Sequence, residues 1–109
     1  MERRSALDAA IAQALELFDD LGPVRSRKMF GGAGLFLDGR IFGLVAFERI
    51  YLKADGALAE ALAAEGAEQF AYEARGRTMR MGYWSLPEAA LDDRDLAASW
   101  ARRALAAQG

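Results

Sequence analysis

The stretch of sequence that decides the fold is residues 28–53, KMFGGAGLFLDGRIFGLVAFERIYLK. It predicts three antiparallel strands joined by two tight turns. Asp38-Gly39 indicates the first turn, because a type I′ hairpin turn needs positive φ at both of its central residues. Glu48-Arg49 is predicted to form the second two-residue turn. This pattern specifies a sheet, and by itself it specifies neither a reaction nor a ligand.

The two turns set which residues lie opposite one another, and directly opposed residues share a face of the sheet. Leu35 is then opposite Phe42, and Val45 is opposite Leu52. One predicted face is wholly apolar and must be buried: Phe36, Ile41, Gly43, Val45, Phe47, Ile50 and Leu52. The other is apolar in its middle and charged at its margins: Leu35, Leu37, Arg40, Phe42, Leu44, Ala46, Tyr51 and Lys53. A solvated face is normally polar, so we expect helices, a partner subunit or a ligand to cover this second face.

The rest of the chain alternates between helical and strand patterns. Helices are predicted over residues 6–21, over residues 56–65 and toward the C-terminus, beginning at Ser5 with Asp8, at Asp55, and at Asp92 with Asp95. Further strands are predicted over residues 24–30, 69–74 and 78–84, with Arg75-Gly76 as a hairpin turn. The order αββββαββα favours an α+β domain over residues 1–109, with an antiparallel sheet of about five to six strands and three main helices.

Composition excludes several classes of function. The 109 residues contain no Cys and no His, which removes disulfides, thiol nucleophiles, histidine bases and the usual zinc sites. No nucleophile–base–orienter set is recognisable, so we expect no enzyme activity, no cofactor and no metal. No apolar run approaches the roughly 18 residues of a membrane span, and the N-terminus carries no signal-like segment. A cytoplasmic protein without a membrane partner is expected.

Charge is distributed unevenly although the net charge is only −2. Residues 24–53 hold six basic and two acidic residues, so the predicted sheet is basic and the helices are acidic. A basic patch would form if two sets of cations came together: Arg25, Arg27 and Lys28 with Arg75, Arg77 and Arg80. Such a patch would neutralise phosphates and bind nucleic acid in a salt-dependent way. Charged residues on edge strands also serve simply to block aggregation.

The glycine-rich segment of residues 29–34 is predicted to be architectural. It matches no phosphate-binding motif, and no helix follows it. Met29 and Phe30 are expected in the core. At least one of Gly31, Gly32 and Gly34 should have positive φ or admit a neighbouring backbone closely, because glycine has no Cβ.

Two blocks of sequence resemble a known family. The first comprises Met29-Phe30-Gly31-Gly32, Gly34-Leu35-Phe36, Asp38-Gly39, Phe42, Leu44-Val45 and Tyr51-Leu52-Lys53, and the second Met81-Gly82-Tyr83-Trp84 with Leu86-Pro87. In this order they resemble the N-terminal domain of the TfoX/Sxy competence-regulator family, over nearly the whole chain. The resemblance implies a bacterial, α+β, non-enzymatic domain. Full-length members act in natural transformation with a cyclic-AMP receptor protein at competence promoters. This chain ends at Gly109, so we expect a stand-alone N-terminal domain without the family's separate C-terminal domain.

The leading hypothesis is a non-catalytic regulatory or adaptor domain that works by protein contact, with a transcription regulator as one candidate partner and a homodimer as another. The best candidates for the contact surface are Phe42, Leu44 and Tyr51. The second hypothesis is nucleic-acid binding through the basic sheet region. The third is an enzyme or small-molecule binder, which would need a pocket with convergent polar groups near Tyr51 and Tyr83. Met81-Gly82-Tyr83-Trp84 is expected to serve core packing, with a pocket as the alternative.

Overall fold

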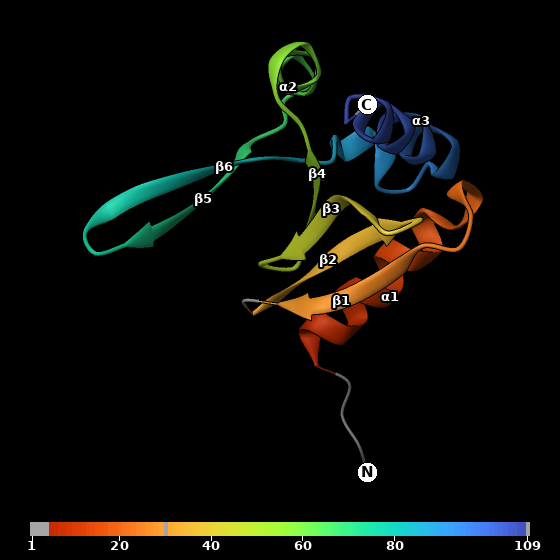
Figure 1. Cartoon of the computed structure of the whole chain (residues 1–109), viewed down its shortest axis with the longest axis horizontal. Helices are drawn as coiled ribbons and strands as arrows, with labels where there is room; N and C mark the ends of the chain where they lie inside the picture. The colour runs from red at the N-terminus through yellow and green to blue at the C-terminus, as the bar shows by residue number, and fades with distance from the viewer. Residues whose placement is uncertain (1–4, 30, 109) are drawn as a thin grey trace.

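The computed structural model describes residues 5–29 and 31–108, and the predicted α+β fold is confirmed (Figure 1). The helices are α1 (Ala6–Leu17), α2 (Gly56–Ala64) and α3 (Arg94–Ala106), with short 3₁₀ segments η1 (Asp19–Leu21) and η2 (Glu88–Ala90). The strands are β1 (Arg25–Met29), β2 (Gly32–Leu37), β3 (Arg40–Ala46), β4 (Arg49–Lys53), β5 (Gln69–Ala74) and β6 (Arg77–Ser85). Apart from the 3₁₀ turns the order is αββββαββα, as the sequence predicts. No helix in the described ranges is long and apolar enough to cross a membrane.

The six strands form one antiparallel sheet in the order β1-β2-β3-β4-β6-β5. The strands β1 and β5 are therefore its two edges. Only residues 83–85 of β6 pair with β4. The remainder of β5 and β6 continues as a two-stranded arm that projects away from the body of the sheet (Figure 1). We call this hairpin the β5–β6 arm.

Two of the three predicted hairpin turns lie where the sequence places them. Asp38 and Gly39 have φ of 51° and 79°, and the turn at the tip of the β5–β6 arm likewise has two residues with positive φ. The turn between β3 and β4 is shifted by one residue from its prediction. Its positive-φ residues are Phe47 and Glu48, while Arg49 already belongs to β4 and pairs with Ala46. The shift leaves an aromatic side chain at the tip of the turn.

A β-bulge changes the predicted faces of the sheet. Leu37 pairs with Arg40 as predicted, but Leu35 pairs with Gly43, so Phe42 is an extra residue on β3. Such a residue shifts the alternation of side chains by one position. Leu35 and Phe42 therefore join Val45 in the core. The predicted faces were wrong for the end of the hairpin next to its turn, where Phe36 and Ile41 lie on the opposite face from the core.

The core lies between the sheet and its helices. Helices α1 and α3 pack on β3 and β4, and α2 adds Leu58 and Leu62 to the same cluster. Phe42 and Phe18 meet edge to face with ring centroids 5.3 Å apart, and both are fully buried. We call the side of the sheet that these helices cover the helix side, and the opposite side the open face.

Local hydrogen bonds set the beginnings of the helices. Ser5 Oγ accepts from the Asp8 amide at 3.0 Å, as the capping pattern predicts. The last helix begins one residue away from its prediction: Asp93 is the N-cap, and its Oδ1 accepts from the Leu96 amide at 3.0 Å. Asp55 is the N-cap residue of α2, although its side chain makes no capping bond in the described structure.

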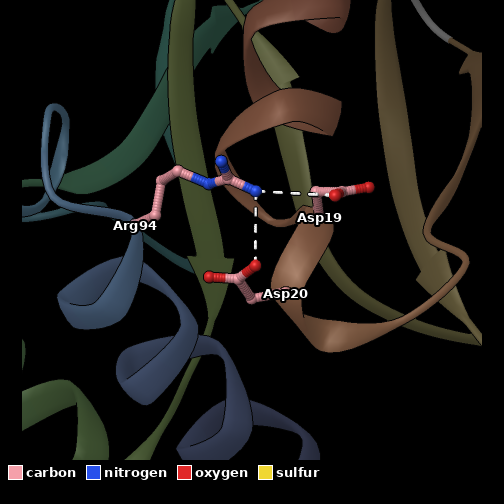
Figure 2. Close-up of polar contacts among 3 residues, drawn as sticks. All are labelled: Asp19, Asp20 and Arg94. Atoms are coloured by element: carbon pink, nitrogen blue, oxygen red, sulfur yellow. Dashed lines mark hydrogen bonds and ion pairs between the residues drawn. The ribbon is translucent and has the colours of Figure 1, made fainter.

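Ion pairs join η1 to the start of α3. Arg94, at the start of α3, extends toward η1, and its Nη2 lies 3.2 Å from Asp20 Oδ1 and 3.5 Å from Asp19 Oδ2 (Figure 2). All three side chains are substantially exposed, so the pairs add little stability. Asp20 also lies beside Asp92, Asp93 and Asp95 at the start of α3, and Arg94 partly neutralises this acidic cluster.

Candidate functional site

The open face of the sheet carries an apolar groove of about 540 Å³. Its walls come from the end of β1, from β3 and its turn, and from the base of the β5–β6 arm. The principal lining side chains are Met29, Leu44, Phe47, Phe70, Tyr72, Met81 and Tyr83. The hydroxyl groups of the two tyrosines are the polar side-chain groups of this lining. The groove therefore suits an apolar surface better than a polar ligand.

Large exposed apolar side chains gather at this groove. Phe47 is 69% exposed, Tyr72 40% and Met81 40%, and Met79, which pairs with Tyr72 further along the arm, is 41% exposed. Among the described residues the other exposed large apolar side chain is Leu91, which lies just after η2. Contiguous apolar surface of this kind marks an interaction site far more often than scattered single residues do.

Phe70 holds the aromatic wall of the groove together. Its ring stacks on Phe47 at 5.7 Å between centroids and meets Tyr51 edge to face at 5.1 Å. The ring of Tyr72 follows at 6.1 Å. Offset and edge-to-face contacts are the preferred arrangements of aromatic pairs. The base of the β5–β6 arm is thus attached to the β3–β4 turn through aromatic packing.

Glycines shape the other end of the groove. A Cβ built on Gly34 would lie 2.9–3.1 Å from side-chain atoms of Phe36, Met29 and Ile41, which close over this position. A Cβ on Gly32 would lie only 2.4 Å from the carbonyl oxygen of Val45. The close backbone approach predicted for this segment is confirmed, and so is a positive φ, which Gly31 adopts at 78°.

Met29 and Phe30 are the two residues that were predicted to anchor the glycine-rich segment in the core. Met29 is only partly buried and lines the groove, so its prediction as a core anchor was wrong. The reason is that β1 is an edge strand, and its alternation turns Met29 toward the open face. Phe30 lies outside the described residues.

The three predicted contact residues are separated by the structure. Phe42 was the wrong choice, because the bulge turns it into the core, where it is fully buried. Tyr51 does lie on the open face, but Phe70 and the guanidinium of Arg49, 5.7 Å from its ring, bury it. Leu44 is partly exposed and lines the groove.

The second sequence block divides between the core and the groove. Trp84 packs against the core, and the carbonyl of Gly82 accepts a hydrogen bond from the Ala54 amide at 3.0 Å. Met81 and Tyr83 instead line the groove, so their prediction as core residues was wrong. Burial raises the pKa of the Tyr83 hydroxyl above its usual range. Period-two alternation of large apolar residues in both arm strands, Phe70 with Tyr72 and Met79 with Met81, was the signal for this surface.

The two sets of basic residues do not converge, so the condition that the sequence analysis set for a single basic patch is not met. Arg25, Arg27 and Lys28 lie on β1, whereas Arg75, Arg77 and Arg80 lie on the β5–β6 arm at the opposite edge of the sheet. Each set is also divided between faces. Lys28 Nζ pairs with Asp8 Oδ1 at 2.8 Å on the helix side, which lowers the pKa of the Asp8 carboxyl. Arg27 lies over the Phe36 ring, 5.5 Å from its centroid, on the open face.

Acidic side chains do not assemble a metal centre in residues 5–29 and 31–108. No group of three or more Asp and Glu side chains there has the spacing to hold an ion. The cluster near the start of α3 is partly neutralised by Arg94, as described above.

Fold and surface together define an α+β domain whose sheet is packed against helices on one side and carries an apolar groove on the other. The sequence matches the TfoX N-terminal domain over residues 16–108, and the chain therefore belongs to the TfoX N-terminal domain family. A search of curated proteins found no match to this sequence.

Proposed function

We propose that this protein is a non-catalytic regulatory or adaptor domain of the cytoplasm that binds a protein partner through the groove on its open face. The observation that carries the proposal is the concentration of exposed apolar side chains there, with Phe47 69% exposed at its rim. Leaving such side chains in water is unfavourable by about 25 cal/mol per Å² of apolar surface. A partner that covers them gains that free energy.

Family membership supports a regulatory role for the domain. The partner we propose is a component of transcriptional regulation, by extension from the competence function to which this family's full-length members are assigned. Nucleic-acid binding is less well supported, because the basic residues on which it depended lie at opposite edges of the sheet.

The test is site-specific photo-crosslinking in the native cell. A photoreactive amino acid replaces Phe47 at the rim of the groove, and a control chain carries it at Ala12, which is exposed on α1. We expect a covalent adduct with another protein from position 47 and none from position 12. Adding Met81→Asp to the first chain should remove the adduct, because a carboxylate in the groove opposes apolar contact. Equal adducts at both positions, or no protein adduct at position 47, would contradict the proposal.

A further inference from the structure

The open face has a charge pattern as well as an apolar groove. Arg25, Arg27 and Met29 alternate with the helix-side residues of β1, and the contact of Arg27 with Phe36 places this row on the open face. On the β5–β6 arm, Arg77, Met79 and Met81 are spaced two residues apart, so Arg77 lies on the same face as the groove. Cations therefore lie at both edges of the apolar surface.

No acidic side chain of the described residues lines the groove, and Glu48, which follows Phe47 in the β3–β4 turn, lines a separate pocket with Arg49. Glu73 of β5 accepts a hydrogen bond from Thr78 on the other face of the arm. Glu68, just before β5, is paired with Arg49 at 3.1 Å. None of the ion pairs among the described residues includes Arg25, Arg27 or Arg77. The open face is thus positive on a chain whose net charge is −2.

The form of the surface favours a helix as its occupant. The groove is part of a sheet face, and a segment that packs on a sheet face is a helix or another sheet, whereas an added strand needs a sheet edge. Helices α1 and α3 already pack in this way on the helix side. A volume of about 540 Å³ accepts several apolar side chains at the i, i+3/i+4 and i+7 positions of a helix.

A second copy of this chain is a poor occupant. Among the described residues, Leu91 is the one large exposed apolar side chain that does not lie on the open face. Another copy could offer an extended apolar surface only with its own open face, and that would bring the arginines of the two copies together. Like-charge juxtaposition across an interface is strongly unfavourable.

We propose that the groove binds an acidic amphipathic helix of a partner protein. The apolar stripe of that helix packs against Leu44, Tyr72 and Met81. Its flanking Asp and Glu side chains pair with Arg25 and Arg27 at one edge and with Arg77 at the other. This inference rests on the proposed function and adds the chemistry of the partner.

The test begins with a displayed library of amphipathic peptides of about 18 residues, roughly 27 Å as helices. The library is selected on the wild-type protein after depletion on Met81→Asp, so that only groove-dependent peptides remain. We expect the selected peptides to hold more Asp and Glu than Lys and Arg, with apolar residues at helical spacing. Recovery of basic peptides, of peptides without helical spacing, or of no groove-dependent peptide would overturn the proposal.

The best selected peptide is then titrated by fluorescence anisotropy. The Arg25→Glu/Arg27→Glu variant should bind about tenfold more weakly or worse, since each reversed pair changes affinity severalfold. A matched control, Arg40→Glu/Arg102→Glu, makes the same change in net charge at exposed positions off the groove and should bind within about twofold of wild type. Affinity should also fall as salt rises. Equal weakening by both variants, or by neither, would overturn the proposal.

Two further probes separate the partner classes. Phosphatidylglycerol vesicles and duplex DNA are titrated under the same conditions. Binding of either that depends on Met81 and exceeds peptide binding would assign the face to that class and overturn the inference. A groove-dependent protein crosslink without selection of acidic helices would overturn only this inference, whereas absence of the crosslink would also overturn the proposed function.

Discussion

Replacing Phe42 with alanine tests the central feature of the fold, the bulge that moves this residue from the open face to the core. Phe42 is fully buried and meets Phe18 edge to face at 5.3 Å. Leu44, two residues along β3, lines the groove and is only partly buried. Without the bulge these two side chains would share one face, so the pair Phe42→Ala and Leu44→Ala distinguishes the two arrangements.

The expected magnitudes differ because the two side chains are buried to different extents. Truncating a fully buried phenylalanine costs about 3–5 kcal/mol of unfolding free energy, which includes the transfer of the ring and the cavity that remains. The edge-to-face contact with Phe18 accounts for about 0.5–1.5 kcal/mol of that cost. Leu44→Ala removes side-chain atoms that are already partly in contact with water, so we expect roughly 1–2 kcal/mol. A domain of this size has a total stability of about 5–15 kcal/mol, so both variants remain measurable.

Urea unfolding followed by tryptophan fluorescence provides the measurement. We expect the midpoint to fall much further for Phe42→Ala than for Leu44→Ala, with an unchanged dependence on urea, which would show that the denatured state is unaffected. In the peptide-binding assay the order should reverse, because Leu44 lines the groove and Phe42 does not. A loss below about 1.5 kcal/mol for Phe42→Ala, or equal losses for both variants, would refute the assignment of faces.

Two other outcomes follow from the geometry. Gly32→Ala should lower the unfolding free energy by about 1–3 kcal/mol, because its Cβ would lie 2.4 Å from a β3 carbonyl oxygen. The control Gly82→Ala should be tolerated, since its Cβ would lie 3.6 Å from the nearest neighbouring atom. Equal melting temperatures for the two variants would contradict the close approach at Gly32. In a Tyr51→Phe/Tyr72→Phe background, the ultraviolet absorbance titration of Tyr83 should have its midpoint above the ordinary tyrosine value of about 10, since burial disfavours the phenolate. The folded state then keeps a proton that the unfolded chain loses, so this contribution to stability is complete below about pH 10 and disappears as the pH rises through the folded pKa. A midpoint at or below that of free tyrosine would contradict the burial.

The exposed apolar surface of the folded protein differs from the contact surface that the sequence predicts. Sequence alternation placed a contact surface at Phe42, Leu44 and Tyr51, and of these Leu44 lies in the groove that replaces it. The larger part of that surface comes from the β5–β6 arm. Its apolar side chains are exposed because the arm extends beyond the paired part of β6 (Figure 1). An isolated two-stranded ribbon is marginally stable in water, and a bound partner would support it.

Local features of this protein were readable from the sequence because they depend on residues that are neighbours in the chain. Asp38-Gly39 and Arg75-Gly76 form two-residue turns with positive φ, which glycine adopts freely and aspartate more readily than most residues do. Ser5 begins α1 because its hydroxyl reaches an amide three residues ahead. Hydrophobic periodicity then gave the order of helices and strands, and the sequence blocks around residues 29–53 and 81–87 indicated the family.

Tertiary structure alone decided which side chains are buried and which surface is available. One extra residue in β3 moves Phe42 across the sheet, where it packs against Phe18, and period-two alternation cannot reveal such an extra residue. The pairing of β4 with β6, distant in sequence, puts the two arginine groups at opposite edges. The same pairing leaves the β5–β6 arm projecting and creates the groove. Burial depends on neighbours that come together only when the whole sheet forms, and for that reason the sequence by itself determined the elements but not the site.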